Sequence, residues 1–149
     1  MGLFAFRIFV LAALVVFAAP AAKAASVQEL FERYGLIGTW GFDCSQPPSV
    51  QNPYVFYRLL DAEHVARDTM NSPTNRINAS VADFLIESNP NEVVISVKTE
   101  RGRTNLTVRI ERKRIRTFQS TRDNGEKVIV NGRFIERNTE TLWFNKCAF

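Results

Sequence analysis

Apolar and polar side chains alternate with a period of two through much of the second half of the chain. In residues 93–98 and again in residues 105–110, every second side chain is apolar and its neighbours are mainly polar. This period places the apolar side chains on one face of a strand. Arg101-Gly102-Arg103 lies between the two segments, so the pattern predicts an antiparallel hairpin.

Similar patterns, separated by turn-forming residues, predict further strands along the chain. Asn131-Gly132 has the form of a two-residue hairpin turn that needs positive φ. Residues 76–87 form a longer and less regular segment, for which a helical turn at 81–86 stays open. We expect the other strands at 37–44, 54–60, 64–69, 114–121, 127–130, 133–137 and 141–146.

One short helix is expected before the strands. Ser26-Val27-Gln28-Glu29 has the form of a capping box, and apolar residues follow it at helical spacing until Gly35. Residues 26–34 are therefore predicted to form an amphipathic helix. No second helix of comparable strength is predicted.

The first 24 residues have the pattern of a cleaved secretory signal. Arg7 precedes an apolar run from Ile8 to Ala19, and Ala22-Lys23-Ala24 follows as a small-x-small tripeptide. The run is too short to span a hydrocarbon core of about 30 Å. We expect cleavage after Ala24, no membrane span, and a periplasmic or secreted product made of one domain, residues 25–149.

The expected mature chain has a small net charge, but its positive charges are concentrated in one segment. The full chain has 19 Lys and Arg residues against 15 acids, and loss of Arg7 and Lys23 leaves a net charge of about +2. Much of the positive charge lies in residues 98–116. A basic segment without an accompanying aromatic platform does not favour nucleic acid as a partner.

Cys44 and Cys147 are the only cysteines, and His64 is the only histidine. This set lacks the ligands of an ordinary zinc site, and we expect neither a metal nor a cofactor. In an oxidising compartment the two cysteines are expected to form a disulfide that closes a loop of about a hundred residues. Free or intermolecular thiols are the alternative.

The strand pattern raises the question of how the sheet edges are protected. Pairing the first strand with the last removes both edges at once, and a Cys44–Cys147 bridge would bring those strands together. We therefore expect an all-β antiparallel meander of eight to ten strands that closes into a barrel. A β-sandwich with a disulfide-linked terminus is the main alternative.

The short helix followed by Gly38-Thr39-Trp40 resembles the Gly-x-Trp start of lipocalins and related calycin barrels. The resemblance implies that Trp40 closes the narrow end and that a cation near the last strand covers its ring. Arg137 is the expected cation, because Lys146 departs from the family's arginine. The second lipocalin signature, a Thr-Asp-Tyr turn, is missing.

Two further resemblances point to the cell envelope. The same start is similar to that of bacterial periplasmic metalloproteinase inhibitors, although their disulfide joins nearer positions. Segments such as Asp43-Cys44-Ser45, Asp68-Thr69-Met70 and Trp143-x-Asn145-Lys146-Cys147 resemble uncharacterised small exported proteins of α-proteobacteria. These resemblances imply a periplasmic address without assigning an activity.

Residues that would mark an enzyme are not found in a recognisable pattern. His64 has no nucleophile-elbow sequence to work with, and the acids show no spacing that singles out a catalytic pair. We therefore expect no enzymatic activity. The function expected instead is binding, by an exported monomer.

Two groups of residues are the candidates for binding. Aromatic side chains of the first strands could line a cavity for a small apolar or amphipathic ligand, and a basic run could bind an anionic component of the envelope. A proteinase inhibitor or envelope interaction module, acting through loop 45–53 or the basic run, is the alternative. The predicted ligand-binding residues are Trp40, Tyr54, Phe56, Arg112, Arg114 and Arg116.

Overall fold

The computed structural model describes residues 25–148 and begins with the predicted helix, α1 (Val27–Arg33). The Ser26 hydroxyl accepts a hydrogen bond from the Glu29 N–H, and the Glu29 carboxylate accepts one from the Ser26 N–H. Both bonds satisfy amides that a helix start leaves unpaired. The capping box is confirmed. The expected signal, residues 1–24, and Phe149 lie outside the described residues.

Ten strands follow, within the predicted range of eight to ten. They are β1 (Gly38–Gly41), β2 (Tyr54–Leu59), β3 (Val65–Met70), β4 (Arg76–Asn89), β5 (Glu92–Thr99), β6 (Gly102–Glu111), β7 (Arg114–Arg122), β8 (Lys127–Val130), β9 (Arg133–Phe134) and β10 (Phe144–Lys146). Neighbours in sequence pair antiparallel from β1 to β9, as in a meander.

The last strand closes the sheet into a barrel. β10 pairs with β1 through Trp40↔Lys146 and with β7 through Phe144↔Ile115. β1 to β7 and β10 thus form a closed eight-stranded barrel, and β8 and β9 continue from the far end of β7 as an extra ribbon. The all-β barrel is confirmed, and the sandwich alternative is wrong.

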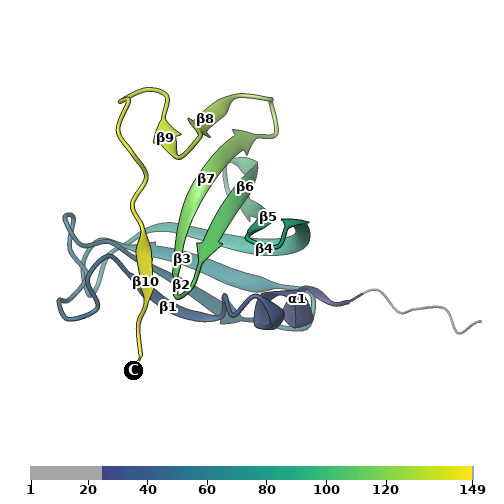
Figure 1. The fold of residues 1–149 in the computed structure, drawn as a ribbon, viewed down its shortest axis with the longest axis horizontal. Helices are drawn as coiled ribbons and strands as arrows, with labels where there is room; N and C mark the ends of the chain where they lie inside the picture. The colour runs from purple at the N-terminus through teal and green to yellow at the C-terminus, as the bar shows by residue number, and fades with distance from the viewer. Residues whose placement is uncertain (1–24, 149) are drawn as a thin grey trace, which may run out of the picture.

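Successive antiparallel strands send alternate loops to opposite ends of the barrel. Loops 42–53, 71–75, 100–101 and 123–126 lie at one end, which we call the mouth. α1 lies at the other, closed end, where the Gln28 N–H donates to the Ala62 carbonyl at 2.9 Å. In Figure 1 the loops of the mouth lie at the left and top, and α1 lies at the lower right.

The irregular segment is one long strand. β4 spans 14 residues, and its pairing with β5 shifts register between Ala82 and Phe84 and again between Glu87 and Asn89. Such bulges insert an unpaired residue and change which residues face the interior. The alternative of a helical turn at 81–86 is wrong, because the bulges, rather than a helix, interrupt the period.

The predicted disulfide is present between Cys44, just after β1, and Cys147, just after β10. The Cys147 N–H also donates to the Thr39 carbonyl at 2.9 Å. β10 is only three residues long, so the disulfide adds a covalent link where the barrel closes. Part of the expected strand 141–146 lies outside β10: the Thr141 N–H donates to the Gly132 carbonyl at 2.8 Å, and its hydroxyl donates to the Thr117 carbonyl.

The core fills the closed half of the barrel. Phe31 and Leu36 from the helical end pack with Val65, Val93 and Ile95 of the wall, and all five are fully buried. Burial of such side chains stabilises the fold by about 1.5–3 kcal/mol each. The closed half is therefore a packed interior with little free space.

Trp40 is part of this packed end. Its indole N–H donates to the Leu36 carbonyl at 2.7 Å, and its side chain is buried. The cation over its ring is Lys146, whose Nζ lies 4.6 Å from the ring centroid. The expectation for Arg137 is wrong, since its guanidinium lies 4.9 Å from the Phe134 ring. Lys146 reaches Trp40 because β10 and β1 are paired at these two residues.

Candidate ligand cavity

A cavity of about 650 Å³ occupies the half of the barrel nearest the mouth. This volume falls in the range of small-molecule binding sites, about 300–1,000 Å³. Its walls are mainly apolar, with threonine and serine hydroxyls between the apolar side chains. The apolar walls include Val55, Val97, Leu106, Val128, Ile129, Phe134 and Phe144, and the hydroxyls include Thr69, Thr104, Thr117 and Ser120.

Three arginines and no carboxylates are among the described residues that line the cavity. Arg122 is near the mouth, where its Nη1 lies 2.6 Å from a Glu126 carboxylate oxygen. Arg137 stacks on Phe134. Arg67, the third, has no ion-pair partner among residues 25–148.

Arg67 forms part of the cavity floor. It lines the cavity and also a void of about 10 Å³ below it, together with Val108 and Ile115 from the other side of the barrel. Its Nε donates to the Tyr57 hydroxyl at 3.3 Å and its Nη1 to the Thr69 hydroxyl at 3.4 Å. These long bonds to neutral oxygens do not balance the positive charge, so an anion at the floor would be stabilised.

Loop 42–53 at the mouth is held by its own side chains. The buried Asn52 side chain accepts from the Asp43 N–H and donates to the carbonyls of Asp43, Gln46 and Pro47. The Tyr54 hydroxyl donates to two of the same carbonyls. The loop is therefore fixed in one shape beside the cavity, with Cys44 anchoring its first part.

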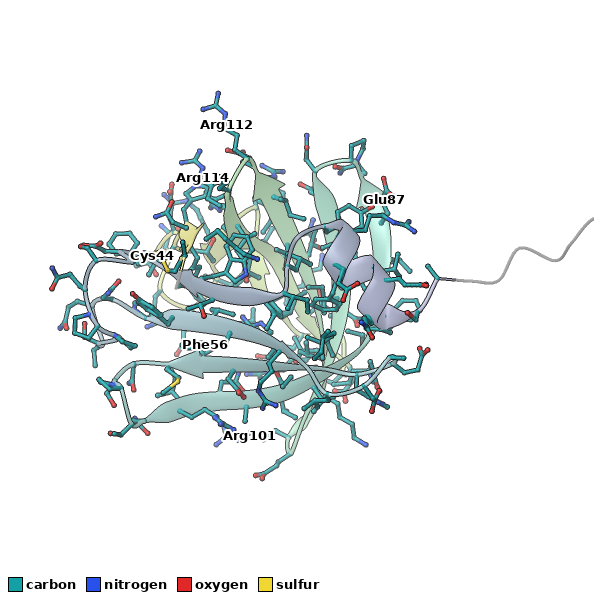
Figure 2. All side chains as sticks on the ribbon, turned by 90° about the horizontal axis from the view of Figure 1, so that it is seen from below. Cys44, Phe56, Glu87, Arg101, Arg112 and Arg114 are labelled. Atoms are coloured by element: carbon teal, nitrogen blue, oxygen red, sulfur yellow. A yellow bond between two sulfur atoms is a disulfide. The ribbon has the colours of Figure 1, made fainter. Side chains whose placement is uncertain are left out.

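The predicted aromatic site residues lie outside the cavity. Trp40 is in the packed closed end, and Tyr54 points outward, beneath loop 42–53. Phe56 also faces outward and lines a groove with Thr39 and Met70. Figure 2 shows Phe56 well apart from Arg112. The structure does not bring these three rings into one site.

The predicted basic residues lie on the outside of the barrel. Arg114 and Arg116 share a face of β7, and their guanidiniums lie 4.4 and 5.1 Å from the Trp143 ring centroid. Arg112 does not share that face, because it is in the turn before β7 with φ +55°. Figure 2 shows Arg112 at the tip of this turn, pointing away from the barrel.

These basic residues differ in what else they bind. Arg116 donates to the Gly132 carbonyl and the Thr141 hydroxyl, so it holds the segment that leads to β10. Arg114 is paired with Glu111 at 2.8 Å. A groove of about 620 Å³ that contains Arg112 and Lys113 lies beside the turn, at the closed end of the barrel. An anionic envelope component as its ligand stays a prediction.

Sequence reasoning missed Arg67 and the cavity-lining residues of β2 and β3. On β2, Val55 and Tyr57 point into the barrel, and Tyr54 and Phe56 point outward. Because both pairs are apolar or aromatic, the sequence does not show which pair is inside. On β3, Val65 and Thr69 lie two residues before and after Arg67, so the three side chains share one face of the strand. The apolar Val65 was a weak signal that this face is the inner one.

The described residues offer little for other chemistry. No group of three or more His, Cys, Asp and Glu residues within 25–148 is arranged to hold a metal ion. Within the same residues, no helix has the length and apolar character needed to cross a membrane. Comparisons of the chain with family models, characterised proteins and solved structures found no match.

Proposed function

We propose that this protein is an exported, non-enzymatic binding barrel for a small amphipathic molecule that carries one acidic group. The observation that supports this most directly is the position of Arg67, without a carboxylate partner in the described chain, on the floor of a largely apolar cavity of about 650 Å³. The signal-like start of the sequence and the disulfide support a periplasmic or secreted location.

The two parts of such a ligand would meet different parts of the cavity. Its acidic group would lie at Arg67, where a charge-assisted hydrogen bond contributes about 1.5–3 kcal/mol. Its apolar part would lie against the walls formed by Val97, Leu106 and Phe144. Each methylene removed from water there adds about 0.8 kcal/mol.

Binding of a fluorescent fatty acid and of the matching fatty alcohol by the delipidated protein tests this function. We expect the wild type to prefer the acid by about tenfold or more, the equivalent of one charge-assisted hydrogen bond. Arg67→Met should lose that preference and still bind the alcohol. Arg58→Met, which removes an exposed arginine of the same sheet, is the matched control.

The result that would contradict the proposal is equally direct. A folded wild type that takes up neither probe, and that carries no small molecule in native mass spectrometry, is not a binding barrel of this kind. Equal binding of acid and alcohol by wild type and Arg67→Met would remove Arg67 from the site.

The rigidity of loop 42–53 favours a second candidate, a proteinase inhibitor or envelope interaction module. A loop fixed before binding loses little conformational entropy when a partner binds it. Titration of a panel of purified metalloproteinases and serine proteinases with the protein tests inhibition. Asn52→Ala, which removes the hydrogen bonds that fix the loop, should weaken any inhibition found. A panel without inhibition would count against this candidate.

A further inference from the structure

Three exposed apolar side chains surround the mouth of the cavity. Val50 in loop 42–53 is 70% exposed, Ile77 near the start of β4 is 53% exposed, and Leu142 before β10 is 39% exposed. All three also line the cavity. Each therefore joins the apolar interior to the outer surface. Exposed apolar side chains gathered at an opening indicate an interaction surface more strongly than the same side chains scattered singly.

Val50 is held outward by its surroundings. Ser49 and Asn52 exchange backbone hydrogen bonds of 3.0 and 3.1 Å across a tight turn that has Val50 in its centre. Because the Asn52 side chain also fixes the loop, Val50 cannot easily fold back into the barrel. The most exposed apolar side chain among those identified at the surface is thus presented by a rigid support.

Charges of both signs lie near the mouth, and some of them are paired. Loop 100–101 carries Glu100 and Arg101, and loop 123–126 carries Asp123 and Glu126. Arg122 pairs with Glu126 at 2.6 Å, and Arg133 pairs with Glu140 at 3.4 Å. A partner attracted chiefly by net charge is therefore not favoured. A zwitterionic lipid surface accepts apolar side chains and presents both signs of charge. Such a surface fits the mouth better than a partner of one charge sign does.

We infer that the mouth docks on a lipid surface, with Val50, Ile77 and Leu142 inserted between the headgroups. This inference rests on the proposed function, because docking would let the apolar part of a ligand pass between the lipid and the cavity without crossing water. A partner protein would explain the exposed side chains but not their continuity with the cavity walls.

Flotation of the protein with phosphatidylcholine vesicles, without added ligand, tests the docking. Val50→Asp/Ile77→Asp/Leu142→Asp is the mouth variant, and Leu60→Asp/Phe84→Asp/Ile86→Asp changes exposed apolar residues elsewhere by the same charge. We expect the wild type and the control variant to float with the vesicles. The mouth variant should lose at least about tenfold in partitioning, as expected when three inserted apolar side chains become charged.

The role of charge is tested in the same assay. We expect partitioning to change less than about threefold between low and high salt, because charges of both signs lie at the mouth and salt screens attraction and repulsion alike. Binding that requires anionic phosphatidylglycerol and disappears at high salt would overturn the inference. So would a mouth variant that floats as well as the wild type, or a wild type that stays unbound.

Ligand transfer links docking to the cavity. Transfer of a fluorescent fatty acid from vesicles to the wild type should accelerate as vesicle concentration rises, whereas transfer to the mouth variant should not. Circular dichroism shows whether the mouth variant is folded. Because the three positions also line the cavity, its affinity for the probe is measured separately without vesicles, and only the dependence of the transfer rate on vesicle concentration reports on docking. If the mouth instead holds two copies together, sedimentation will show a wild-type dimer and a monomeric mouth variant, which overturns lipid docking.

The two proposals can fail separately. A wild type that floats with vesicles but binds no fatty acid in solution would contradict the proposed function and leave the docking surface standing. A wild type that binds fatty acid in solution but ignores vesicles would contradict only the docking.

Discussion

Lys146 lies over Trp40, with its Nζ 4.6 Å from the centroid of the indole ring. The same ammonium donates to the carbonyls of Gly35 and Ile37, which belong to the segment between α1 and β1. One side chain of the last strand thus connects three parts of the closed end. Burial lowers the pKa of Lys146 from its ordinary value, which indicates that the ammonium is partly removed from water.

Replacing this side chain should destabilise the fold. Lys146→Met keeps most of the length but loses the contact with the ring and leaves two carbonyls without their donor. We expect the free energy of unfolding to fall by about 1–3 kcal/mol, measured by urea denaturation. Lys113→Met, at an exposed turn position, should change it by less than about 0.5 kcal/mol. Equal effects of both changes would show that Lys146 has no special role.

Removing the disulfide should loosen the closure of the barrel. In Cys44→Ser/Cys147→Ser we expect the free energy of unfolding to fall by about 2–5 kcal/mol, because the bridge restricts a long loop of the unfolded chain. Thermal unfolding with and without reductant measures the effect. Reductant should destabilise the wild type and leave the double variant unchanged. A wild type insensitive to reductant, with two titratable thiols when unfolded, would contradict the prediction.

The ion pair between Asp83 and Arg103 makes the stability of the fold depend on pH in the acid range. Arg103 donates to both Asp83 oxygens, including an Nη2–Oδ2 bond of 2.7 Å, and this holds the pKa of Asp83 below its ordinary value. The ionised carboxylate therefore contributes stability that is complete above pH about 4 and is lost as pH falls through the lowered pKa.

Asp83→Asn should remove this contribution. At pH 7 we expect the variant to be less stable than the wild type by about 1 kcal/mol, since the pair is partly exposed. The difference should shrink as the pH falls below about 4. Urea denaturation at several pH values measures it, with Glu140→Gln as a control in a more exposed pair. If the difference in unfolding free energy between the wild type and Asp83→Asn stays constant with pH, the loss of stability comes from packing and not from the ionised carboxylate.

Gly132 and Arg116 should be energetically coupled. Gly132 has φ +72°, and a Cβ at this position would lie 1.9 Å from Arg116 Nη2. We expect Gly132→Ala to cost about 2–4 kcal/mol, combining backbone strain with the clash. Gly125→Ala has a similar φ and open space around it, so it measures the strain alone. In a double-mutant cycle, Arg116→Ala should relieve part of the loss. If the effects of Gly132→Ala and Arg116→Ala on the free energy of unfolding simply add, the new Cβ does not clash with Arg116.

The elements that could be predicted from the sequence are those in which a single periodic pattern or capping motif runs through the whole element. The helix has a complete capping box, and β5 and β6 alternate without interruption. β4 was harder, because its bulges move the inward position from Ala82 to Leu85 and break the period of two. β9 is shorter than expected because the chain turns back after Phe134, whose N–H donates to the Thr139 carbonyl, and Asn138 in this turn has φ +51°. β10 is shorter because the Thr141 N–H donates to the Gly132 carbonyl, outside the barrel ladder.

The candidate site was less accessible from the sequence, because β2 is apolar on both faces. Its pattern does not say whether Tyr54 and Phe56 or Val55 and Tyr57 point into the barrel. The answer depends on tertiary structure, since loop 42–53 covers Tyr54 on the outside. Arg67 could be recognised only after the inward face of β3 was known. The disulfide was predictable because two cysteines allow a single intramolecular pairing.

The place of α1 determines how the molecule can be attached to something else. α1 lies at the closed end, so residue 25 leaves the barrel away from the mouth, whereas residue 148 follows Cys147, which is bonded to Cys44 of loop 42–53. A flexible tether, a reporter domain or a sensor chip joined before α1 would keep the opening pointing outward. A fusion at residue 25 should therefore leave binding measurements unchanged, whereas one at residue 148 would lie beside loop 42–53.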